Sequence, residues 1–318
     1  MLLLVLSASA AATRPLIIGH RGASGHRPEH TLESYRLAIE MGADFIEPDL
    51  VSTKDGVLIA RHENEIGGTT DAADRFPDRK RTKTIDGESI AGWFSEDFTL
   101  AEIKTLRARE RLPFRSHAYD GQFQVPTFDE VLDLAQSLGR TAGRPIGVYP
   151  ETKHPTYFRG IGLPLEGALL ASLAKHEWNR RDAPVFIQSF EKGNLQELRT
   201  KTRVRLVQLV DLGPSVPLDD PGLKAMAQYA DVLGANKMLV IPANEDGTLK
   251  EPTDLVARAH AAGLLVHVWT LRADKEFLSP SYRGRAEAEF EQFRALGVDG
   301  IFTDFPDLAT RALGGSRD

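Results

Sequence analysis

The chain has 318 residues, of which 42% are hydrophobic, and this is enough for one large domain or two small ones. Its formal net charge is −6, with 39 basic and 45 acidic residues intermixed and no basic stripe, so nucleic acid is not expected as a partner. There is no cysteine, which excludes disulfides, thiolate catalysis and cysteine-bound zinc, and leaves carboxylates and histidines to bind hard cations.

The N-terminus carries a short apolar run, Leu2 to Leu6, followed by small residues with Ala-x-Ala character. This pattern is typical of the hydrophobic region and cleavage site of a secretory signal peptide, although the usual basic start is missing. The run is too short to span a bilayer. We therefore predict a signal-peptide remnant over residues 1–12, a periplasmic or secreted protein, and no stable membrane insertion. The alternative is a frayed apolar tail.

His20 and Arg21 come directly after the first strand-like run, Leu16–Gly19. An imidazole titrates near neutral pH, and a guanidinium is a fixed cation suited to phosphate oxygens. The pair is therefore a candidate for acid–base chemistry beside a phosphate. A helix is predicted next over Thr31–Met41, with its first residue as the N-cap. For His30 we predict a role in shaping the loop before that helix.

A hairpin is predicted around Asp55-Gly56, a dipeptide favoured in two-residue turns. Side chains two positions apart on a strand share a face, so Glu47 and Asp49 should point the same way. With a two-residue turn, Asp49 faces His62 across the hairpin. The local sequence thus predicts two carboxylates and an imidazole on one surface. The alternative is an exposed hairpin with ordinary polar side chains.

The stretch from about Asn64 to Val125 is rich in charge and lacks a clear hydrophobic period, with one short helix predicted over Thr99–Arg109. Insertions of this length in a compact domain are usually functional. Because it follows His62 directly, we expect it to cover the site and exclude bulky substrates without supplying a catalytic group. We predict one domain over residues 13–318 that contains this insertion, numbered approximately 64–125.

Strand-like and helix-like segments alternate over most of the chain, which predicts an α/β fold, a parallel sheet closed into a TIM-type (β/α)8 barrel. The predicted strands number nine, and the hairpin explains the surplus over eight. They are Leu16–Gly19, Phe45–Val51, Val57–Arg61, Ile146–Pro150, Val185–Ser189, Arg205–Val210, Val232–Ala235, Leu264–Trp269 and Gly300–Thr303. The predicted helices after the insertion are Thr127–Leu138 (ending at Gly139), Leu165–His176, Gly193–Thr200, Thr253–Ala262 and Ala286–Leu296.

Glu151 and Lys153 follow the run Ile146–Pro150, so they fall at the carboxyl end of a predicted strand, where such barrels build active sites. A single Glu-x-Lys is common on exposed strands, but here it joins the residues of the first strands. Three carboxylates suit Ca²⁺ or Mg²⁺, two cations suit phosphate oxygens, and two imidazoles provide a base and an acid. These residues are Glu47, Asp49 and Glu151; Arg21 and Lys153; and His20 and His62.

In its ordered set of motifs the chain resembles the glycerophosphodiester phosphodiesterase family, from Leu16 to Asp307. The ordered set is specific, whereas no single motif is. The Pro-Glu-His-Thr form and the long insertion resemble the periplasmic bacterial branch, which hydrolyses deacylated phospholipids using calcium. The motifs are His20-Arg21-Gly22-Ala23, Pro28-Glu29-His30-Thr31, Gly42-Ala43-Asp44-Phe45-Ile46-Glu47-x-Asp49, Thr53-Lys54-Asp55-Gly56, Arg61-His62-Glu63, Tyr149-Pro150-Glu151-x-Lys153 and Gly300-Ile301-Phe302-Thr303-Asp304-Phe305-Pro306.

The resemblance implies hydrolysis of a glycerophosphodiester to sn-glycerol 3-phosphate and an alcohol, with a divalent cation, Ca²⁺ in preference to Mg²⁺. It implies metal ligation by Glu47, Asp49 and Glu151, acid–base roles for His20 and His62, and phosphate contacts from Arg21 and Lys153. Trp269 is predicted either to contact the glycerol moiety or to pack in the core. The family usually has Asp at the position of Glu63, so Glu63 is not counted as a ligand.

Two other functions stay open. One is a phospholipase D-like phosphodiesterase on the same barrel, which acts on intact lipid and should show an exposed apolar rim. The other is a non-catalytic phosphodiester-binding protein, against which the complete set of histidines and carboxylates argues. The sequence does not specify the head group, the oligomeric state, which histidine is the base, or whether water or the glycerol hydroxyl attacks first.

Overall fold

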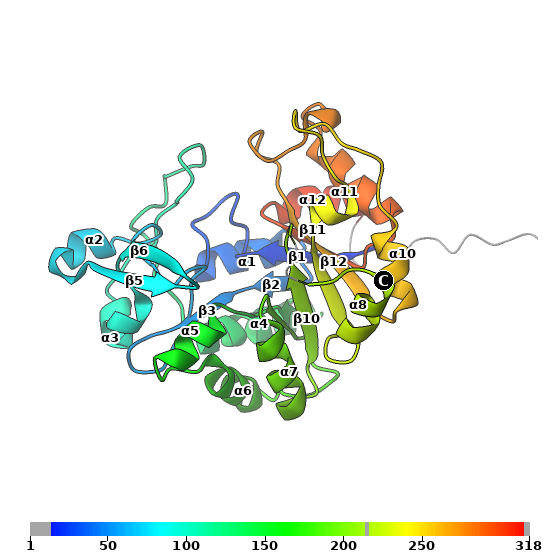
Figure 1. The fold of residues 1–318 in the computed structure, drawn as a ribbon. Helices are drawn as coiled ribbons and strands as arrows, with labels where there is room; N and C mark the ends of the chain where they lie inside the picture. The colour runs from blue at the N-terminus through cyan, green and yellow to red at the C-terminus, as the bar shows by residue number, and fades with distance from the viewer. Residues whose placement is uncertain (1–13, 214–215, 315–318) are drawn as a thin grey trace, which may run out of the picture.

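The barrel strands of the computed structural model form one sheet whose two ends join (Figure 1). The structure describes residues 14–213 and 216–314, and the predicted signal-peptide remnant lies outside them. The strand order is β4-β3-β8-β9-β10-β11-β12-β13-β1-β2-β7. The ring closes because β2 and β3 are halves of one strand and pair with β7 and β8, which are halves of the next.

The sheet has eleven strands in the described chain, of which β4 lies outside the ring. The half-strands β2 and β3 share one barrel position, as do β7 and β8, so the barrel has eight parallel positions. The predicted (β/α)8 barrel is confirmed. The strand left over, β4 (Leu58–Ala60), pairs antiparallel with β3 outside the ring. The barrel strands are β1 (Leu16–His20), β2 (Phe45–Glu47), β3 (Asp49–Ser52), β7 (Gly147–Val148), β8 (Glu151–Thr152), β9 (Phe186–Ser189), β10 (Arg205–Val210), β11 (Val232–Asn236), β12 (Leu265–Leu271) and β13 (Gly300–Thr303).

Helices fill the connections and surround the barrel (Figure 1). None of the described helices is both long and apolar enough to cross a bilayer. The helices outside the insertion are α1 (Leu32–Glu40), α4 (Phe128–Ala142), α5 (Pro155–Gly160), α6 (Leu165–Lys175), α7 (Lys192–Lys201), α8 (Asp220–Met226), α9 (Lys237–Val240), α10 (Leu255–Ala261), α11 (Ala286–Ala295) and α12 (Pro306–Leu313), with a 3₁₀ turn at Pro280–Tyr282.

Two predicted helix ends were wrong. α4 runs through Gly139 to Ala142, and it ends at Gly143, which has the left-handed φ of 64° that favours glycine. Gly139 serves close packing instead, since a Cβ there would lie 3.1 Å from the carbonyl oxygen of Arg144. The helix predicted over Thr99–Arg109 is only one turn, α3 (Leu100–Ile103).

The predicted hairpin exists, but its register is one residue different. Leu50 pairs with Ala60, so Asp49 lies opposite Arg61 and not His62. The amide of Gly56 donates to the carbonyl of Thr53 at 3.0 Å, and Gly56 has a φ of 78°. This is a three-residue loop with glycine in the left-handed region, whereas the prediction assumed a two-residue turn. His62 therefore lies beyond the end of β4.

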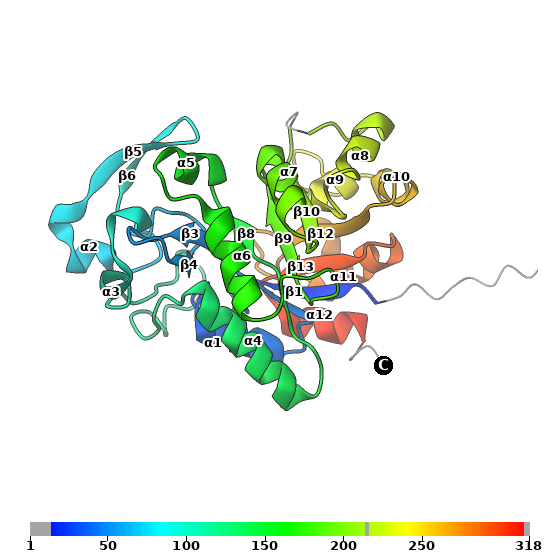
Figure 2. The ribbon, with the colours of Figure 1, turned by 90° about the horizontal axis from the view of Figure 1, so that it is seen from below.

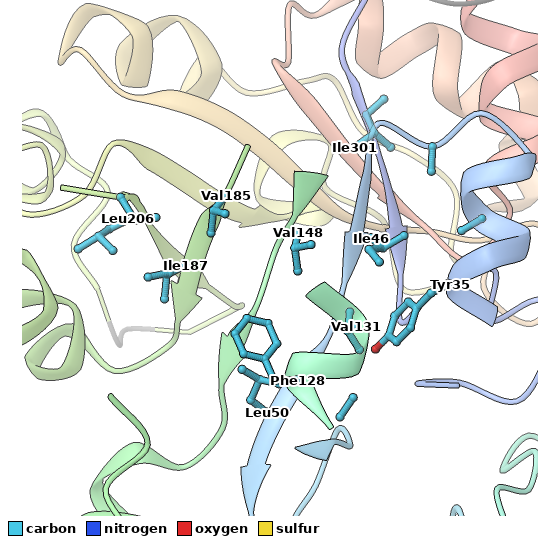
Figure 3. Packing of buried hydrophobic residues seen from close by; sticks show 14 of the residues in the cluster. Tyr35, Ile46, Leu50, Phe128, Val131, Val148, Val185, Ile187, Leu206 and Ile301 are labelled. Carbon is cyan, nitrogen blue, oxygen red and sulfur yellow. The ribbon is translucent and has the colours of Figure 1, made fainter. Parts of the chain in front are cut away.

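Two apolar layers hold the barrel. The outer layer lies between strands and helices, and Figure 3 shows Ile46 and Val148 facing Val131 of α4 within it. The inner layer fills the barrel and is rich in aromatic rings, which closes the interior below the site. The inner layer comprises Ile18, Phe45, Tyr149, Phe186, Val207, Val232 and Phe302.

The insertion lies at one side of the barrel (Figure 2), yet it shares the outer apolar layer. Its elements are α2 (Ala72–Arg75), the hairpin β5 (Arg81–Ile85) and β6 (Glu88–Gly92), α3, and 3₁₀ turns at Pro77–Arg79 and Ser95–Asp97. The side chains of Ile66, Phe98 and Ile103 are fully buried in the same cluster as the barrel residues. The insertion is therefore part of the folded core and not only a cover.

Phe98→Ala should lower the free energy of unfolding by about 3–5 kcal/mol, because it removes a fully buried aromatic ring from a packed layer. Phe114→Ala is the matched control: this ring is in the same insertion but 42% exposed, and we expect a loss of roughly 1 kcal/mol or less. Urea unfolding of both variants measures the difference. Equal losses would contradict the shared core.

Candidate active site

Predicted site residues from neighbouring strands meet at one end of the barrel. In the sheet register, His20 of β1 pairs with Glu47 of β2, and Asp49 of β3 pairs with Glu151 of β8. Ile18, two positions before His20, belongs to the barrel interior. Side chains alternate along a strand, so His20 also points inward, at the carboxyl end. Active sites of (β/α)8 barrels form at this end.

Glu47, Asp49 and Glu151 form a buried group in which one carboxylate oxygen from each lies within 4.8 Å of the others. Lys153 Nζ lies 3.0 Å from Glu151, and the Gln188 amide donates to Glu47 at 2.9 Å. Asp49 Oδ1 is buried without a hydrogen-bond partner among the described residues. Three buried carboxyl groups, one with an oxygen that accepts no hydrogen bond, are compatible with a divalent cation, which prefers oxygen ligands.

Burial and mutual repulsion distribute protons unevenly across this group. Burial raises the pKa of Glu47 well above its ordinary value and raises the pKa of Glu151 to about 8. Burial also acts to raise the pKa of Asp49, but a hydrogen bond from His30 and nearby cationic groups hold it well below its usual range. Without a bound cation the group therefore keeps a proton at neutral pH.

Affinity for a divalent cation should consequently rise with pH between about 6 and 8. Glu151 must lose its proton to act as a ligand, and with a pKa raised to about 8 it is mostly protonated below that value. We expect roughly tenfold weaker binding for each pH unit below 8. Calorimetric titration with Ca²⁺, in buffers that differ in protonation enthalpy, measures both the affinity and the protons released. Glu151→Gln should reduce the pH dependence without abolishing it, because the pKa of Glu47 is raised as well. A pH-independent affinity of the unchanged protein would contradict this account.

His20 is oriented by a carboxylate from the last barrel strand. Its Nδ1 lies 2.6 Å from Asp304 Oδ1, which leaves Nε2 for the cavity that His20 lines. The other Asp304 oxygen accepts from Arg115 at 2.6 Å and from Arg272 at 2.8 Å. Burial and the charge of Arg21 lower the pKa of His20 to about 3, so the imidazole is neutral and can accept a proton.

His62 has a matching arrangement in the same cavity. Its Nδ1 lies 2.8 Å from Glu63, and Glu63 also contacts His154 at 2.8 Å. Burial and nearby cations lower the pKa of His62 to about 4. Glu63, where the family usually has Asp, is not among the three grouped carboxylates. Its carboxylate instead orients the ring of His62.

Arg21 is fixed by the tight turn after β1. It has a positive φ of 57°, and Gly22 follows with a φ of 89°, where a Cβ would lie 2.4 Å from Ser34 Oγ. The Arg21 amide donates to Glu47 at 2.8 Å, and its guanidinium donates to Glu29 at 3.0 Å. The turn therefore holds one charged side chain beside the carboxylates and keeps it aimed at the cavity.

His30 is a further residue of the site whose contact was not foreseen. It is fully buried, its Nε2 lies 2.9 Å from Asp49 Oδ2, and its Nδ1 lies 2.7 Å from the Tyr35 hydroxyl. The prediction gave His30 a role in the loop before α1, and in fact it holds the orientation of a predicted metal ligand. Histidine–carboxylate contacts of this kind commonly fix ligand geometry.

A cavity of about 340 Å³ opens over the group, a size that suits a small ligand. It brings together every predicted site residue except Lys153, whose ammonium pairs with Glu151. Trp269 is in its wall and also packs against the inner apolar layer, and its indole donates to the Gly234 carbonyl at 2.9 Å. The lining includes His20, Arg21, Glu47, Asp49, His62, Glu151, Gln188, Phe190, Met238, Trp269, Arg272, Glu276 and Phe277.

Comparison with known proteins gives a consistent result. The chain matches the model of the Glycerophosphoryl diester phosphodiesterase family over residues 20–308. It is 38% identical over 320 residues to glycerophosphodiester phosphodiesterase GDPD6 of Arabidopsis thaliana, covering 92% of this chain and 84% of that protein. It is 30% identical over 340 residues to the glycerophosphodiester phosphodiesterase of Haemophilus influenzae, covering 95% and 90%.

Solved structures share the fold. The glycerophosphodiester phosphodiesterase of Agrobacterium tumefaciens superposes with a TM-score of 0.62 at 20% identity, covering 93% of this chain and 99% of that one. A phosphodiesterase of Oleispira antarctica, solved with the product sn-glycerol-3-phosphate, superposes with a TM-score of 0.67 at 21% identity, covering 94% and 96%.

Proposed function

The chain belongs to the glycerophosphoryl diester phosphodiesterase family and is a hydrolase of that class, and from this we propose that it splits small deacylated diesters such as glycerophosphocholine into sn-glycerol 3-phosphate and an alcohol. One observation carries the proposal. Two histidines, each paired with a carboxylate, line the same cavity as three grouped carboxylates and a fixed arginine.

Charge in the cavity suits a phosphodiester. Arg21, which Glu29 already orients, would contact the phosphoryl oxygens. Lys153 pairs with Glu151 and does not line the cavity, so it would reach a phosphoryl oxygen only if its side chain turned away from Glu151. Glu47, Asp49 and Glu151 would hold the cation, Ca²⁺ in preference to Mg²⁺, because Ca²⁺ accepts several carboxylates in flexible geometry whereas Mg²⁺ keeps more waters. When bound, such a cation supplies Lewis-acid stabilisation of negative charge on the phosphoryl group.

The two histidines divide the proton transfers. One neutral imidazole accepts the proton of the attacking hydroxyl through Nε2, while its Nδ1 stays hydrogen-bonded to a carboxylate that stabilises the imidazolium. The other, once protonated, delivers a proton to the oxygen of the leaving alcohol. An adjacent glycerol hydroxyl as the first nucleophile would benefit from intramolecular proximity.

A second candidate is a phosphodiesterase that acts on larger, lysophospholipid-like diesters. Exposed apolar side chains follow the carboxyl ends of three barrel strands: Phe190 after β9, Leu212 after β10 and Met238 after β11. Phe190 and Met238 also line the cavity. Such a rim would fit an acyl chain. The insertion adds one exposed ring to it, Phe114, which packs against Phe277 of the cavity wall.

Turnover of glycerophosphocholine and lysophosphatidylcholine by the purified protein tests both candidates. The small-diester proposal expects release of sn-glycerol 3-phosphate and a higher kcat/KM for glycerophosphocholine. A higher kcat/KM for the lysophospholipid would favour the second candidate. No turnover of either diester in the presence of Ca²⁺ or Mg²⁺, by folded protein, would sink the catalytic proposal and leave phosphodiester binding.

We also propose that the protein is exported to the periplasm or the medium. The support is the apolar run Leu2 to Leu6 and the small residues after it. N-terminal sequencing of the protein recovered from a fractionated host tests this. An intact N-terminus in the cytoplasmic fraction alone would contradict it.

A further inference from the structure

The geometry points to Arg115, a residue of the insertion, as a positioning residue for the proposed reaction: we infer that it acts through Asp304 to hold the ring of His20. This inference rests on the proposed function. It also gives the insertion a second role, since the insertion was expected only to cover the site and to supply no catalytic group.

Arg115 joins three loops at the carboxyl end of the barrel. Its Nη2 donates to Asp304 Oδ2 after β13 at 2.6 Å and to Asp274 Oδ2 after β12 at 2.6 Å. Its Nη1 donates to the Ser24 carbonyl after β1 at 3.0 Å. The Arg115 side chain is 5% exposed, so these charge-assisted hydrogen bonds are shielded from water and stronger than surface pairs.

Asp304 is a shared acceptor, and its two oxygens have different tasks. Oδ1 meets His20 Nδ1, while Oδ2 is held by Arg115 on one side and by Arg272 on the other. With both Arg115 and Arg272 bound, the plane of the Asp304 carboxylate is fixed, and Oδ1 is held toward His20. With only Arg272 left, the carboxylate can rotate toward that residue, and the hydrogen bond that sets the tautomer of His20 weakens.

Arg115 does not line the cavity, whereas Arg272 and His20 do. Its removal should therefore change the placement of a reacting group more than the binding of substrate. Misplacement of a catalytic group by about 1 Å can cost roughly 10²-fold in rate. We expect Arg115→Gln to lower kcat roughly 10- to 100-fold, with KM within about threefold of the unchanged enzyme.

Arg109→Gln is the matched control. Arg109 lies in the same insertion and carries the same charge, but its guanidinium contacts Asp74, and both side chains are exposed. This variant should keep kcat. Arg115→Lys should recover part of the loss, since one ammonium reaches one carboxylate but does not reproduce the planar fork that bridges two.

A double-mutant cycle with His20→Ala separates positioning from general damage. If Arg115 acts through His20, Arg115→Gln should cause little further loss in the His20→Ala background. Nitrogen NMR of the His20 ring should show a mixed tautomer in Arg115→Gln and a single one in Arg109→Gln. Additive losses in the cycle, or an Arg115→Gln kcat equal to that of Arg109→Gln, would overturn the inference.

The same experiments distinguish this inference from the function it rests on. If the unchanged protein does not hydrolyse glycerophosphocholine, the proposed function fails. If it does and Arg115 proves silent, only the inference fails. Should Arg115→Gln not fold, Arg115→Lys carries the test by itself: full kcat and a single His20 tautomer in that variant would overturn the inference, and a partial loss confined to kcat would support it.

Discussion

Removal of divalent cations by a chelator should abolish turnover of glycerophosphocholine, with a loss of roughly 10³-fold or more, and Ca²⁺ or Mg²⁺ should restore it. Glu47, Asp49 and Glu151 are buried with their carboxylates grouped, and no residue of the described chain donates to Asp49 Oδ1. Without a cation, this negative group faces the phosphate and repels it. Initial rates with and without chelator, followed by addition of each ion, give the measurement.

Unfolding curves with and without chelator are the necessary control, because a cation that binds only the native state also stabilises it. Protein that stays folded in chelator and loses activity supports a catalytic cation. Asp49→Asn provides a second arm, since it keeps the shape of the side chain and removes the charge. Full turnover in metal-free buffer, or full turnover by Asp49→Asn, would refute the assignment.

His20→Ala and His62→Ala should each lower kcat by roughly 10²-fold or more, the usual contribution of a positioned acid or base. Folding should survive in both cases. After loss of the first ring, Asp304 keeps two arginine partners, and after loss of the second, Glu63 keeps His154. Steady-state kinetics on glycerophosphocholine, with thermal unfolding of each variant, measure the two effects.

His26→Ala is a suitable comparison for these variants. His26 lies near the same barrel end, contacts Asp307 at 3.0 Å and does not line the cavity. We expect it to keep near-normal kcat. If either cavity histidine also kept near-normal kcat when replaced, its assignment as an acid or base would be wrong.

The inward-facing half of the candidate site could be predicted because short-range rules govern it. Alternation along a strand puts Glu47 and Asp49 on one side, and the carboxyl ends of neighbouring strands bring Glu151 beside them. The same rule could also have predicted Asp304 as a site residue, because it directly follows the last barrel strand. The hairpin register failed on one local detail, the left-handed Gly56 that lengthens the turn.

The residues that support the site from the loops, Arg115 and His30, could not be predicted from a sequence pattern. Arg115 lies 159 positions from Asp274 and 189 from Asp304, in a segment whose charges follow no period. Nothing in the local sequence distinguishes it from Arg109, which lies on the surface. The hydrogen bond between His30 and Asp49 likewise depends on a buried loop conformation, with a positive φ at His30, that sequence patterns do not indicate.

The contact between His20 and Asp304 spans 284 positions of the chain, across the seam where β1 meets β13. The grouped carboxylates lie on β2, β3 and β8, none of which takes part in the β1–β13 pairing. The carboxylate group and the orientation of His20 therefore depend on different strand pairs. A chain in which β1 and β13 are not paired can still group the three carboxylates, while the ring of His20 lacks its Asp304 partner. The orientation of His20 thus requires the closed barrel, and a contact between such distant segments carries a high cost in chain entropy.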